Sequence, residues 1–265
     1  MIQLDEIAVA RRAAEEAGAI LREKLDHVRN IEFKGERDLV TEADRLSQER
    51  IISIISEAFP GDRILCEESP DKSIIGNPGR IEGRLWIIDP LDGTTNFAHG
   101  LRLFAISIAL MQDGELVMGL VSDPNSREMV IAKKGKGTYL GETRIRTSKT
   151  ESLDKSLLAT GFPYHITKSK DNNINHFINF TFKTQAVRRL GSAALALTYV
   201  ALGRLDGYWE IGLSPWDIAA GILLVREAGG TVSDFSGGVS DPFKRQIVAS
   251  NGLIHPAMLD TLRAG

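Results

Sequence analysis

Apolar residues at helical spacing open the chain. Between residues 4 and 25 they recur every three or four positions, which predicts an amphipathic helix. A second helix is predicted from Thr41 to Phe59, because the next two residues, Pro60-Gly61, form a pair that ends helices. The charged stretch between the two helices, Glu32 to Asp38, predicts an exposed loop.

Short apolar runs then predict β-strands at Arg63–Cys66 and at residues 84–88. From Leu103 onward the runs are separated by turn signals, first Asp113-Gly114 and then Asp123-Pro124-Asn125. This pattern predicts an antiparallel meander, with strands at residues 104–111, 116–122, 128–132, 137–139 and 144–145.

The second half of the chain alternates between strand and helix patterns. Strands are predicted at residues 157–160, 206–210, 231–233 and 247–249, and helices at residues 192–203, 215–228 and 255–263. The fold class is therefore α/β, or α+β if the meander forms a separate layer. We find no repeat or long linker, so we expect a single catalytic domain over residues 1–265, with sub-layers at 1–150 and 151–265.

Composition narrows the class of protein. The 265 residues carry a formal net charge of −3, so no basic field favours a nucleic-acid partner. The one cysteine, Cys66, forms no internal disulfide, and no apolar run approaches the ~18 residues that span a membrane. The N-terminus has acidic residues rather than an apolar signal segment. We therefore expect a cytoplasmic protein without a membrane partner.

The most informative stretch for function is residues 84–96, where an apolar strand stops at two carboxylates. Asp89 and Asp92 follow the strand, and Gly93-Thr94-Thr95 comes next. Carboxylate oxygens suit a hard divalent cation, and the carbonyl of Leu91 offers another oxygen between them. A glycine turn with free backbone N–H groups suits a phosphate oxygen. Together these features predict metal-assisted phosphate chemistry.

Other carboxylates could join this site, but each also has an ordinary structural interpretation. Glu67-Glu68 follows the strand at Arg63–Cys66, yet such a pair is usually solvated. Asp217 comes three residues after Ser214, so it could serve only to cap a helix. Asp44 stands in a similar capping arrangement after Thr41.

Taken together, these segments resemble the inositol monophosphatase family of magnesium-dependent, lithium-sensitive phosphatases. The run from Asp89 to Thr95 is similar to the first signature of that family, and Trp216-Asp217-Ile218-Ala219-Ala220-Gly221 is similar to the second. Supporting matches occur in family order over nearly the whole chain: Lys34, Asp38 to Thr41, Asp44, Glu67-Glu68-Ser69, Gly191 to Ala194 and Glu210.

The resemblance implies a layered α/β/α/β/α sandwich and a homodimer. It implies about two or three Mg²⁺ ions in the active site, a number in line with two-metal phosphatases. The ligands it implies are Glu67, Asp89, the Leu91 carbonyl, Asp92 and Asp217. It places the phosphate on the backbone of Gly93, Thr94 and Thr95. Lys34 and its charged loop would close over the site, unless they form a plain solvated loop.

The implied reaction is hydrolysis of a phosphate monoester of a small polyol, with myo-inositol monophosphate the expected substrate and metal-activated water the nucleophile. Thr94 would orient that water with support from Asp44, while Glu67 polarises it. Substrate hydroxyls would meet side chains and backbone groups from several segments, and Tyr208 and Trp209 would shape the pocket. These substrate contacts are Asp92, Gly191, Ser192, Ala193, Glu210 and Asp217.

Several alternatives stay open at this point. The substrate could be fructose 1,6-bisphosphate, alone or in a dual activity, or histidinol phosphate. A 3′-phosphoadenosine nucleotide is less favoured, because relatives that act on it commonly have lysine in place of Thr95. A regulatory protein that binds protein or RNA on the same scaffold is a further alternative, with Arg188-Arg189 and Lys133–Lys136 as short basic clusters. Cys66 replaces a glycine common before the two glutamates, and we expect a buried inert thiol there.

Overall fold

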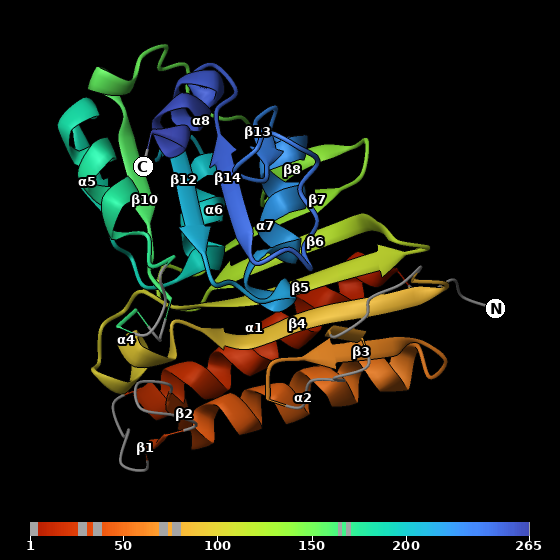
Figure 1. The fold of residues 1–265 in the computed structure, drawn as a ribbon. Helices are drawn as coiled ribbons and strands as arrows, with labels where there is room; N and C mark the ends of the chain where they lie inside the picture. Colours follow the sequence, from red (N-terminus) through yellow and green to blue (C-terminus); the bar gives the residue numbers. More distant parts are fainter. Residues whose placement is uncertain are drawn as a thin grey trace.

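The computed structural model describes residues 5–25, 31–33, 39–68, 74–75, 81–163, 166–167 and 171–264. Helices and sheets alternate in layers, with one helix pair below a large sheet, a second pair between the two main sheets and a third pair above (Figure 1). Three apolar cores lie between these layers and hold them together. The α/β class and the layered sandwich predicted from the sequence are confirmed.

The larger sheet has seven strands in the order β3-β4-β5-β6-β7-β8-β9. Strands β3 and β4 pair in parallel, and all other neighbouring strands of this sheet pair antiparallel. Strands β5 to β9 form the predicted meander. Its strands are β3 (Arg63–Cys66), β4 (Arg84–Asp92), β5 (Ala105–Gln112), β6 (Glu115–Asp123), β7 (Glu128–Lys133), β8 (Gly137–Leu140) and β9 (Thr143–Ile145).

Helices α1 (Glu6–Leu25) and α2 (Glu42–Ala58) cover one face of this sheet, as Figure 1 shows. The stripe of α1 that faces inward is rich in alanine, so the two helices pack closely against each other and against the sheet. A short antiparallel pair, β1 (Ile31–Phe33) and β2 (Leu39–Thr41), connects them.

The smaller sheet has five strands in the order β11-β10-β12-β14-β13. Strand β10 pairs in parallel with β11 and β12, while β14 is antiparallel to both of its neighbours. Its strands are β10 (Leu157–Thr160), β11 (Ala186–Arg188), β12 (Gly207–Ile211), β13 (Thr231–Ser233) and β14 (Gln246–Ser250). The short 3₁₀ helix η1 (Leu153–Lys155) leads into β10.

Helices α6 (Ala193–Ala201) and α7 (Pro215–Glu227) fill the space between the sheets, and glycines allow close contact there. A Cβ at Gly119 of β6 would lie 2.8 Å from the Ala220 carbonyl oxygen of α7. A Cβ at Gly221 would lie 2.4 Å from the Leu197 side chain of α6. Both distances are far below van der Waals contact, so glycine is required at both positions for α7 to pack against β6 and α6.

Helices α5 (Ile174–Lys183) and α8 (His255–Arg263) cover the outer face of the smaller sheet. The sequence predicted α8 but missed α5 and β11. Nearly all residues of α5 are isoleucine, asparagine, histidine, phenylalanine or threonine, which have low intrinsic helix propensity. Strand β11 has only three residues, too few for an alternating pattern.

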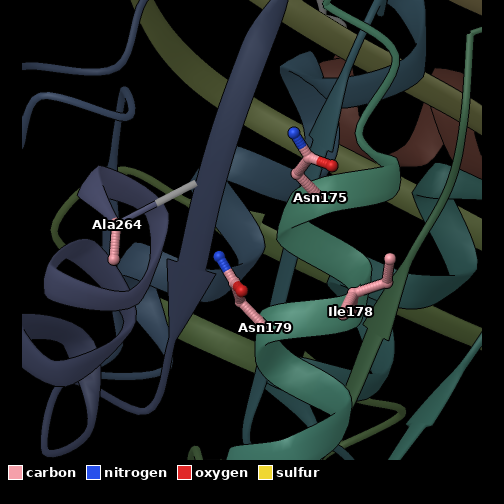
Figure 2. A pocket seen from close by; sticks show the side chains of 4 residues that line it. All are labelled: Asn175, Ile178, Asn179 and Ala264. Atoms are coloured by element: carbon pink, nitrogen blue, oxygen red, sulfur yellow. The ribbon is translucent and has the colours of Figure 1, made fainter.

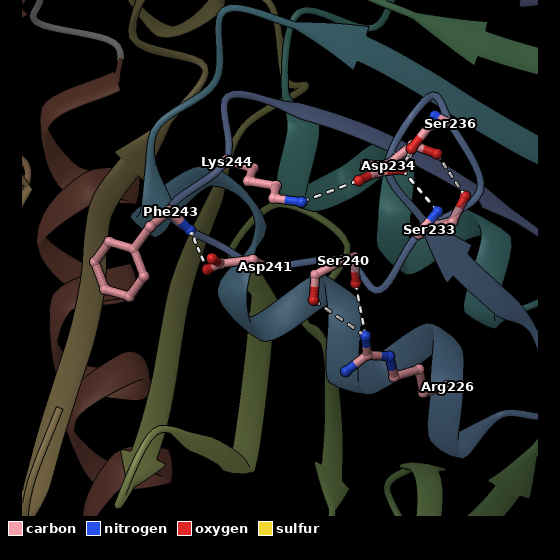
Figure 3. Close-up of polar contacts among 9 residues, drawn as sticks. Arg226, Ser233, Asp234, Ser236, Ser240, Asp241, Phe243 and Lys244 are labelled. Atoms are coloured by element: carbon pink, nitrogen blue, oxygen red, sulfur yellow. Dashed lines mark hydrogen bonds and ion pairs between the residues drawn. The ribbon is translucent and has the colours of Figure 1, made fainter. Parts of the chain in front are cut away.

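The connection from β13 to β14 is a compact loop held by one carboxylate (Figure 3). Asp234 accepts hydrogen bonds from the Ser236 and Gly238 backbone N–H groups at 3.0 and 2.8 Å, and it pairs with Lys244 at 3.0 Å. The next residue, Arg245, accepts a hydrogen bond from the Gly212 N–H at 2.7 Å. The loop therefore fixes the junction between β12 and α7, close to Asp217.

Two predictions near the first signature were wrong. The strand predicted at residues 84–88 continues through Asp92 as β4, and a short helix, α4 (Thr94–Ala98), follows where only a turn was expected. Within the described part of the chain, no helix combines the length and apolar character that crossing a bilayer requires.

Candidate active site

The end of β4 brings two carboxylates to one face of the sheet through an irregularity in pairing. Asp89 pairs with Ser107 of β5, and Asp92 pairs with Ala105. Three steps along β4 thus match two steps along β5, so β4 contains one extra residue. In a regular strand, residues three apart face opposite sides, and the extra residue returns Asp92 to the side of Asp89.

The third carboxylate of the cluster, Asp217, comes from the first turn of α7. Ser214 caps this helix, and Asp217 Oδ2 accepts the Ser214 backbone N–H at 2.7 Å in a capping box. Oxygens of Asp89, Asp92 and Asp217 all lie within 4.8 Å of one another. Asp217 therefore caps the helix and also joins the carboxylate cluster, so the two interpretations from the sequence are compatible.

Glu67 lies next to this cluster at the end of β3, the parallel neighbour of β4. Its backbone N–H donates to the Ile88 carbonyl at 3.3 Å, and its charge raises the pKa of both Asp89 and Asp217. The Glu68 N–H instead donates to Gln48 Oε1 of α2 at 3.1 Å. The parallel pairing of β3 and β4 thus explains why Glu67 approaches residues more than twenty positions away.

The cluster is electrostatically unfavourable by itself. Burial raises the pKa of Asp89, and the charges of Glu67, Asp92 and Asp217 raise it further. Burial also raises the pKa of Asp92 to about 6, although hydrogen bonds to it act in the opposite direction. Among the described residues, no lysine or arginine lowers the pKa of these three aspartates. Buried, mutually repelling carboxylates fit a divalent cation, which would supply the missing positive charge.

The turn after Asp92 leaves no room for a side chain at Gly93. Gly93 has φ +100°, and a Cβ there would lie 2.9 Å from the Leu103 carbonyl oxygen. Asn96 Nδ2 donates to the carbonyls of Leu103 and Leu190 at 2.7 and 2.8 Å. These bonds hold the start of α4 against the segment that carries Gly191.

Thr94 connects this turn to α2. Its hydroxyl lies 3.0 Å from Asp44 Oδ1 and 3.0 Å from the Leu91 carbonyl oxygen, so its single proton points to acceptors on that side. Both Thr94 and Asp44 are buried, whereas Thr95 is exposed. The oxygen lone pairs of Thr94 remain able to accept a hydrogen bond from another group.

Asp92 is held in place from the opposite side by the start of α6. The Ser192 hydroxyl donates to Asp92 Oδ2, and the Ala194 backbone N–H donates to the same oxygen at 2.7 Å. Ser192 Oγ also accepts the Leu195 N–H at 3.2 Å, which caps the helix. Asp92 therefore joins the larger sheet to the middle helical layer, because β4 and α6 meet at its carboxylate.

Glu210 approaches from β12 of the smaller sheet. The Tyr208 hydroxyl donates to Glu210 Oε2, and burial raises the Glu210 pKa to about 7, while Tyr208 and Arg189 act to lower it. Tyr208 thus lies beside Glu210 as expected. Trp209 does not, because alternate residues of a strand face opposite sides, and its ring stacks on Phe180 at 3.9 Å.

Several residues around Glu210 and the Gly93 turn were not predicted from the sequence, among them Asn96, Gly161 and Asn173. No local pattern marks them, because each acts through contacts with distant segments. Lys34, Asp38 and Ser69, which supported the resemblance, lie outside the described residues. Cys66 is buried, and burial and the nearby carboxylates raise its pKa, in agreement with the predicted inert thiol.

Comparison with known proteins identifies the family. The model of the inositol monophosphatase family matches residues 3–264. Inositol-1-monophosphatase of Synechocystis is 45% identical over 97% of this chain and 88% of that protein. Nus factor SuhB of Pseudomonas aeruginosa is 43% identical over 96% and 94% of the two chains. The solved inositol monophosphatase of Anabaena superposes with a TM-score of 0.86 at 40% identity, over 97% of this chain and 94% of that one.

This family consists of metal-dependent phosphatases that act on small phosphorylated substrates, and the cluster of Asp89, Asp92 and Asp217 provides a suitable place for a metal ion. The chain therefore belongs to the inositol monophosphatase family and is a phosphoric monoester hydrolase.

Proposed function

We propose that the protein hydrolyses the phosphate monoester of a small polyol, with myo-inositol monophosphate as the principal substrate. The observation that carries this proposal is the convergence of Asp89, Asp92 and Asp217 beside the Gly93 turn. Metal ligands and a phosphate-binding turn are then adjacent, as hydrolysis of a phosphate ester requires. The Synechocystis relative named inositol-1-monophosphatase supports the choice of substrate.

The metal ligands in this proposal are Glu67, Asp89, the Leu91 carbonyl, Asp92 and Asp217, and the metal is Mg²⁺. One oxygen of Asp89 accepts the Leu91 N–H at 3.0 Å, and one oxygen of Asp217 accepts the Ser214 N–H. These bonds orient both carboxylates and leave the second oxygen of each for a cation. Bound Mg²⁺ supplies Lewis acidity, which neutralises charge on the phosphate and on the departing oxygen.

The phosphate in this proposal binds to the backbone N–H groups of Gly93, Thr94 and Thr95 at the start of α4. The first N–H groups of a helix have no partner within the helix and point outward from its N-terminus. Gly93 allows the turn to approach a phosphate oxygen without a side chain in between.

Thr94 orients the attacking water in this proposal. Because its proton points toward Asp44 and Leu91, its oxygen accepts a hydrogen bond from the water and directs the water lone pair elsewhere. Asp44 is a buried acceptor that keeps the hydroxyl in this orientation. Glu67, beside the cluster, polarises the same water, and no covalent intermediate on the protein is needed.

The substrate hydroxyls in this proposal meet the opposite wall of the site. Glu210 accepts hydrogen bonds from these hydroxyls. The segment Gly191 to Ala193 and the carboxylates of Asp92 and Asp217 line the same space. The Tyr208 hydroxyl fixes one oxygen of Glu210, which leaves the other oxygen for the substrate.

A second activity, on fructose 1,6-bisphosphate, is favoured by Arg189. Its guanidinium lies 5.3 Å above the Phe162 ring, and its charge acts on Glu210. A cation at this rim suits a second phosphate group. If this activity exists, Arg189→Gln raises the KM for the bisphosphate about tenfold, whereas a matched Arg188→Gln change does not. Histidinol phosphate, like the inositol ester, has no second phosphate, so the Arg189→Gln change does not separate these two substrates.

A homodimer is also part of this proposal. Ile174, Ile178 and Phe182 lie one turn apart on α5 and are 42%, 46% and 86% exposed, an apolar stripe that suits a protein interface. A shallow pocket lies beside the stripe, lined by Asn175, Ile178, Asn179 and Ala264 (Figure 2). We expect Phe182→Glu to shift the protein from dimer to monomer in light-scattering measurements, and an unchanged mass would contradict this interface.

The decisive experiment measures phosphate release from four substrates with Mg²⁺ and with EDTA. The panel is myo-inositol 1-phosphate, fructose 1,6-bisphosphate, histidinol phosphate and 3′-phosphoadenosine 5′-phosphate. We expect Mg²⁺-dependent release, fastest from the inositol ester and inhibited by millimolar Li⁺. A regulatory role is the alternative, since a relative of similar identity is named Nus factor. Absence of release from all four substrates by folded, Mg²⁺-binding protein would favour that role.

A further inference from the structure

The wall of the site around Glu210 is built on an unusually close contact with the end of β10. Thr160, the last residue of β10, pairs with Trp209 of β12, and Gly161 follows it. A Cβ added to Gly161 would lie 2.2 Å from Glu210 Oε2. No side chain fits between this backbone and the carboxylate, so the position of Gly161 defines the space that Glu210 occupies.

Asn173 fixes this part of the backbone from behind. It is 2% exposed and stands immediately before α5, with φ +69°, a left-handed conformation that asparagine tolerates better than most residues. Its Nδ2 donates to the Gly161 carbonyl at 2.6 Å and to Thr160 Oγ1 at 2.8 Å. Both amide protons of Asn173 are therefore donated in hydrogen bonds to the end of β10.

The same side chain also holds the residue that precedes Glu210. Asn173 Oδ1 accepts the indole N–H of Trp209 at 2.8 Å, and the Thr160 hydroxyl donates to the Trp209 carbonyl at 2.6 Å. An indole nitrogen only donates and a carbonyl only accepts, so the orientation of the Asn173 amide is determined by its partners. Asn173 thus connects Gly161, which lies against the Glu210 carboxylate, with Trp209, the residue that precedes Glu210 in β12.

We propose that Asn173 is a positioning residue for substrate recognition, which sets the distance between Gly161 and Glu210 and so the geometry with which Glu210 receives the substrate hydroxyls. The inference rests on the proposed function, because the contact between Glu210 and the polyol is part of that proposal. Its physical basis is that a buried, fully paired hydrogen-bond network fixes a side chain more tightly than packing alone.

Asn173→Asp tests the proposal with an almost unchanged side-chain shape. The variant keeps an oxygen for Trp209 but replaces the two amide protons, so the Gly161 carbonyl loses its donor. Asn172→Asp is the matched control, since Asn172 lies one position earlier, is only partly buried, and keeps in the variant the side-chain oxygen that accepts the Ile174 N–H. Gly161→Ala is a second test variant, because its methyl group must displace the Glu210 carboxylate.

The measurement compares myo-inositol 1-phosphate with p-nitrophenyl phosphate, an ester without substrate hydroxyls. For Asn173→Asp and Gly161→Ala we expect the ratio of kcat/KM values, inositol ester to aryl ester, to fall about tenfold, mainly through KM. The Asn172→Asp ratio stays at the wild-type value. A general structural defect would instead lower kcat for both esters and leave the ratio unchanged, which would overturn the proposal.

Two further arms separate this inference from the proposed function. If Asn173→Asp fails to fold, as judged by circular dichroism, Gly161→Ala decides the result. Glu210→Gln tests the underlying contact. An unchanged ratio in Glu210→Gln would refute the role of Glu210 and the inference with it. A lowered ratio in Glu210→Gln together with unchanged ratios in Asn173→Asp and Gly161→Ala would overturn the inference alone.

Discussion

The two sides of the active site are built on different principles. On the side proposed to bind phosphate, called the phosphate side, Asp89 and Asp92 lie in β4 and Gly93 follows directly. On the side proposed to bind substrate hydroxyls, called the hydroxyl side, Gly161, Ser192 and Glu210 come from three separate segments. The first side is specified mainly by local sequence, while the second exists only when β10, β12 and α6 are packed together.

The two sides also differ in how their charges are balanced. Among the described residues, no lysine or arginine offsets the charge of the aspartate cluster, and a bound metal ion would supply that positive charge. Glu210 has the Tyr208 hydroxyl as donor and the charge of Arg189 nearby. The properties of the phosphate side should therefore change with metal and pH, whereas those of the hydroxyl side should change with packing and hydrogen bonding.

The largest effect is expected from Asp92→Asn, because Asp92 lies in the aspartate cluster and also joins α6 through Ser192. We expect kcat/KM to fall by about 10³-fold or more, a loss of about 4 kcal/mol in transition-state stabilisation. Steady-state kinetics measures the change in kcat/KM, and calorimetric titration with Mg²⁺ measures the change in metal affinity. Asp241→Asn, an exposed acid in the loop of Figure 3, serves as control. Equal losses in both variants would contradict a specific role for Asp92.

A smaller effect is expected from Thr94→Ala. Removal of the hydroxyl leaves Asp44 without that donor and the attacking water without its acceptor. We expect kcat to fall about 100-fold, while Mg²⁺ affinity changes less than about threefold. Thr94→Ser restores the hydroxyl and should recover most of the rate. A parallel loss of Mg²⁺ affinity would show that Thr94 supports the metal site rather than the water.

The electrostatic difference predicts a pH dependence of stability in metal-free protein. Folding raises the Asp92 pKa from 3.8 to about 6, so the folded state binds more protons than the unfolded state between these values. Stability is then highest below pH 3.8 as far as this group is concerned, and about 3 kcal/mol is lost as the pH rises through about 6.

Chemical unfolding in EDTA between pH 5 and pH 8 measures about 1.4 kcal/mol of this loss, because the rest occurs as the pH rises to 5. Mg²⁺ added at pH 8 should restore stability, because a cation favours the ionised carboxylates. In Asp92→Asn both the pH effect and the Mg²⁺ effect should shrink. A metal-free protein whose stability does not decline over this range would show that the carboxylates do not repel one another as described.

The smallest effect is expected from Ser214→Ala, which tests the double use of Asp217. The substitution removes one half of the capping box but leaves the backbone N–H that Asp217 accepts. We expect a loss of about 1 kcal/mol in unfolding free energy and a change in kcat of less than about threefold. The exposed Ser126 provides a matched Ser→Ala control. A large loss of activity would mean that the cap itself orients Asp217.

Much of the fold followed from periodic patterns. The meander, α1, α2, α7 and α8 were predicted because their apolar positions repeat at strand or helix spacing along contiguous sequence. Helix α5 was missed because its residues have low helix propensity, and strands β1, β2 and β11 were missed because three residues are too few for an alternating pattern. The extension of β4 to Asp92 was missed because its irregular pairing depends on β5, not on the residues of β4 alone.

The sequence by itself determined the chemistry of the phosphate side, since the carboxylates, the glycine turn and the capping serine occur in local motifs with their own physical causes. Only the tertiary structure decided which side chains face one another. The bond from Thr94 to Asp44 spans 50 positions, and the bond from Ser192 to Asp92 spans 100. Such contacts depend on how layers pack, and packing is not encoded in any short pattern, which is why Gly161, Asn173 and the outward turn of Trp209 appeared only in the folded molecule.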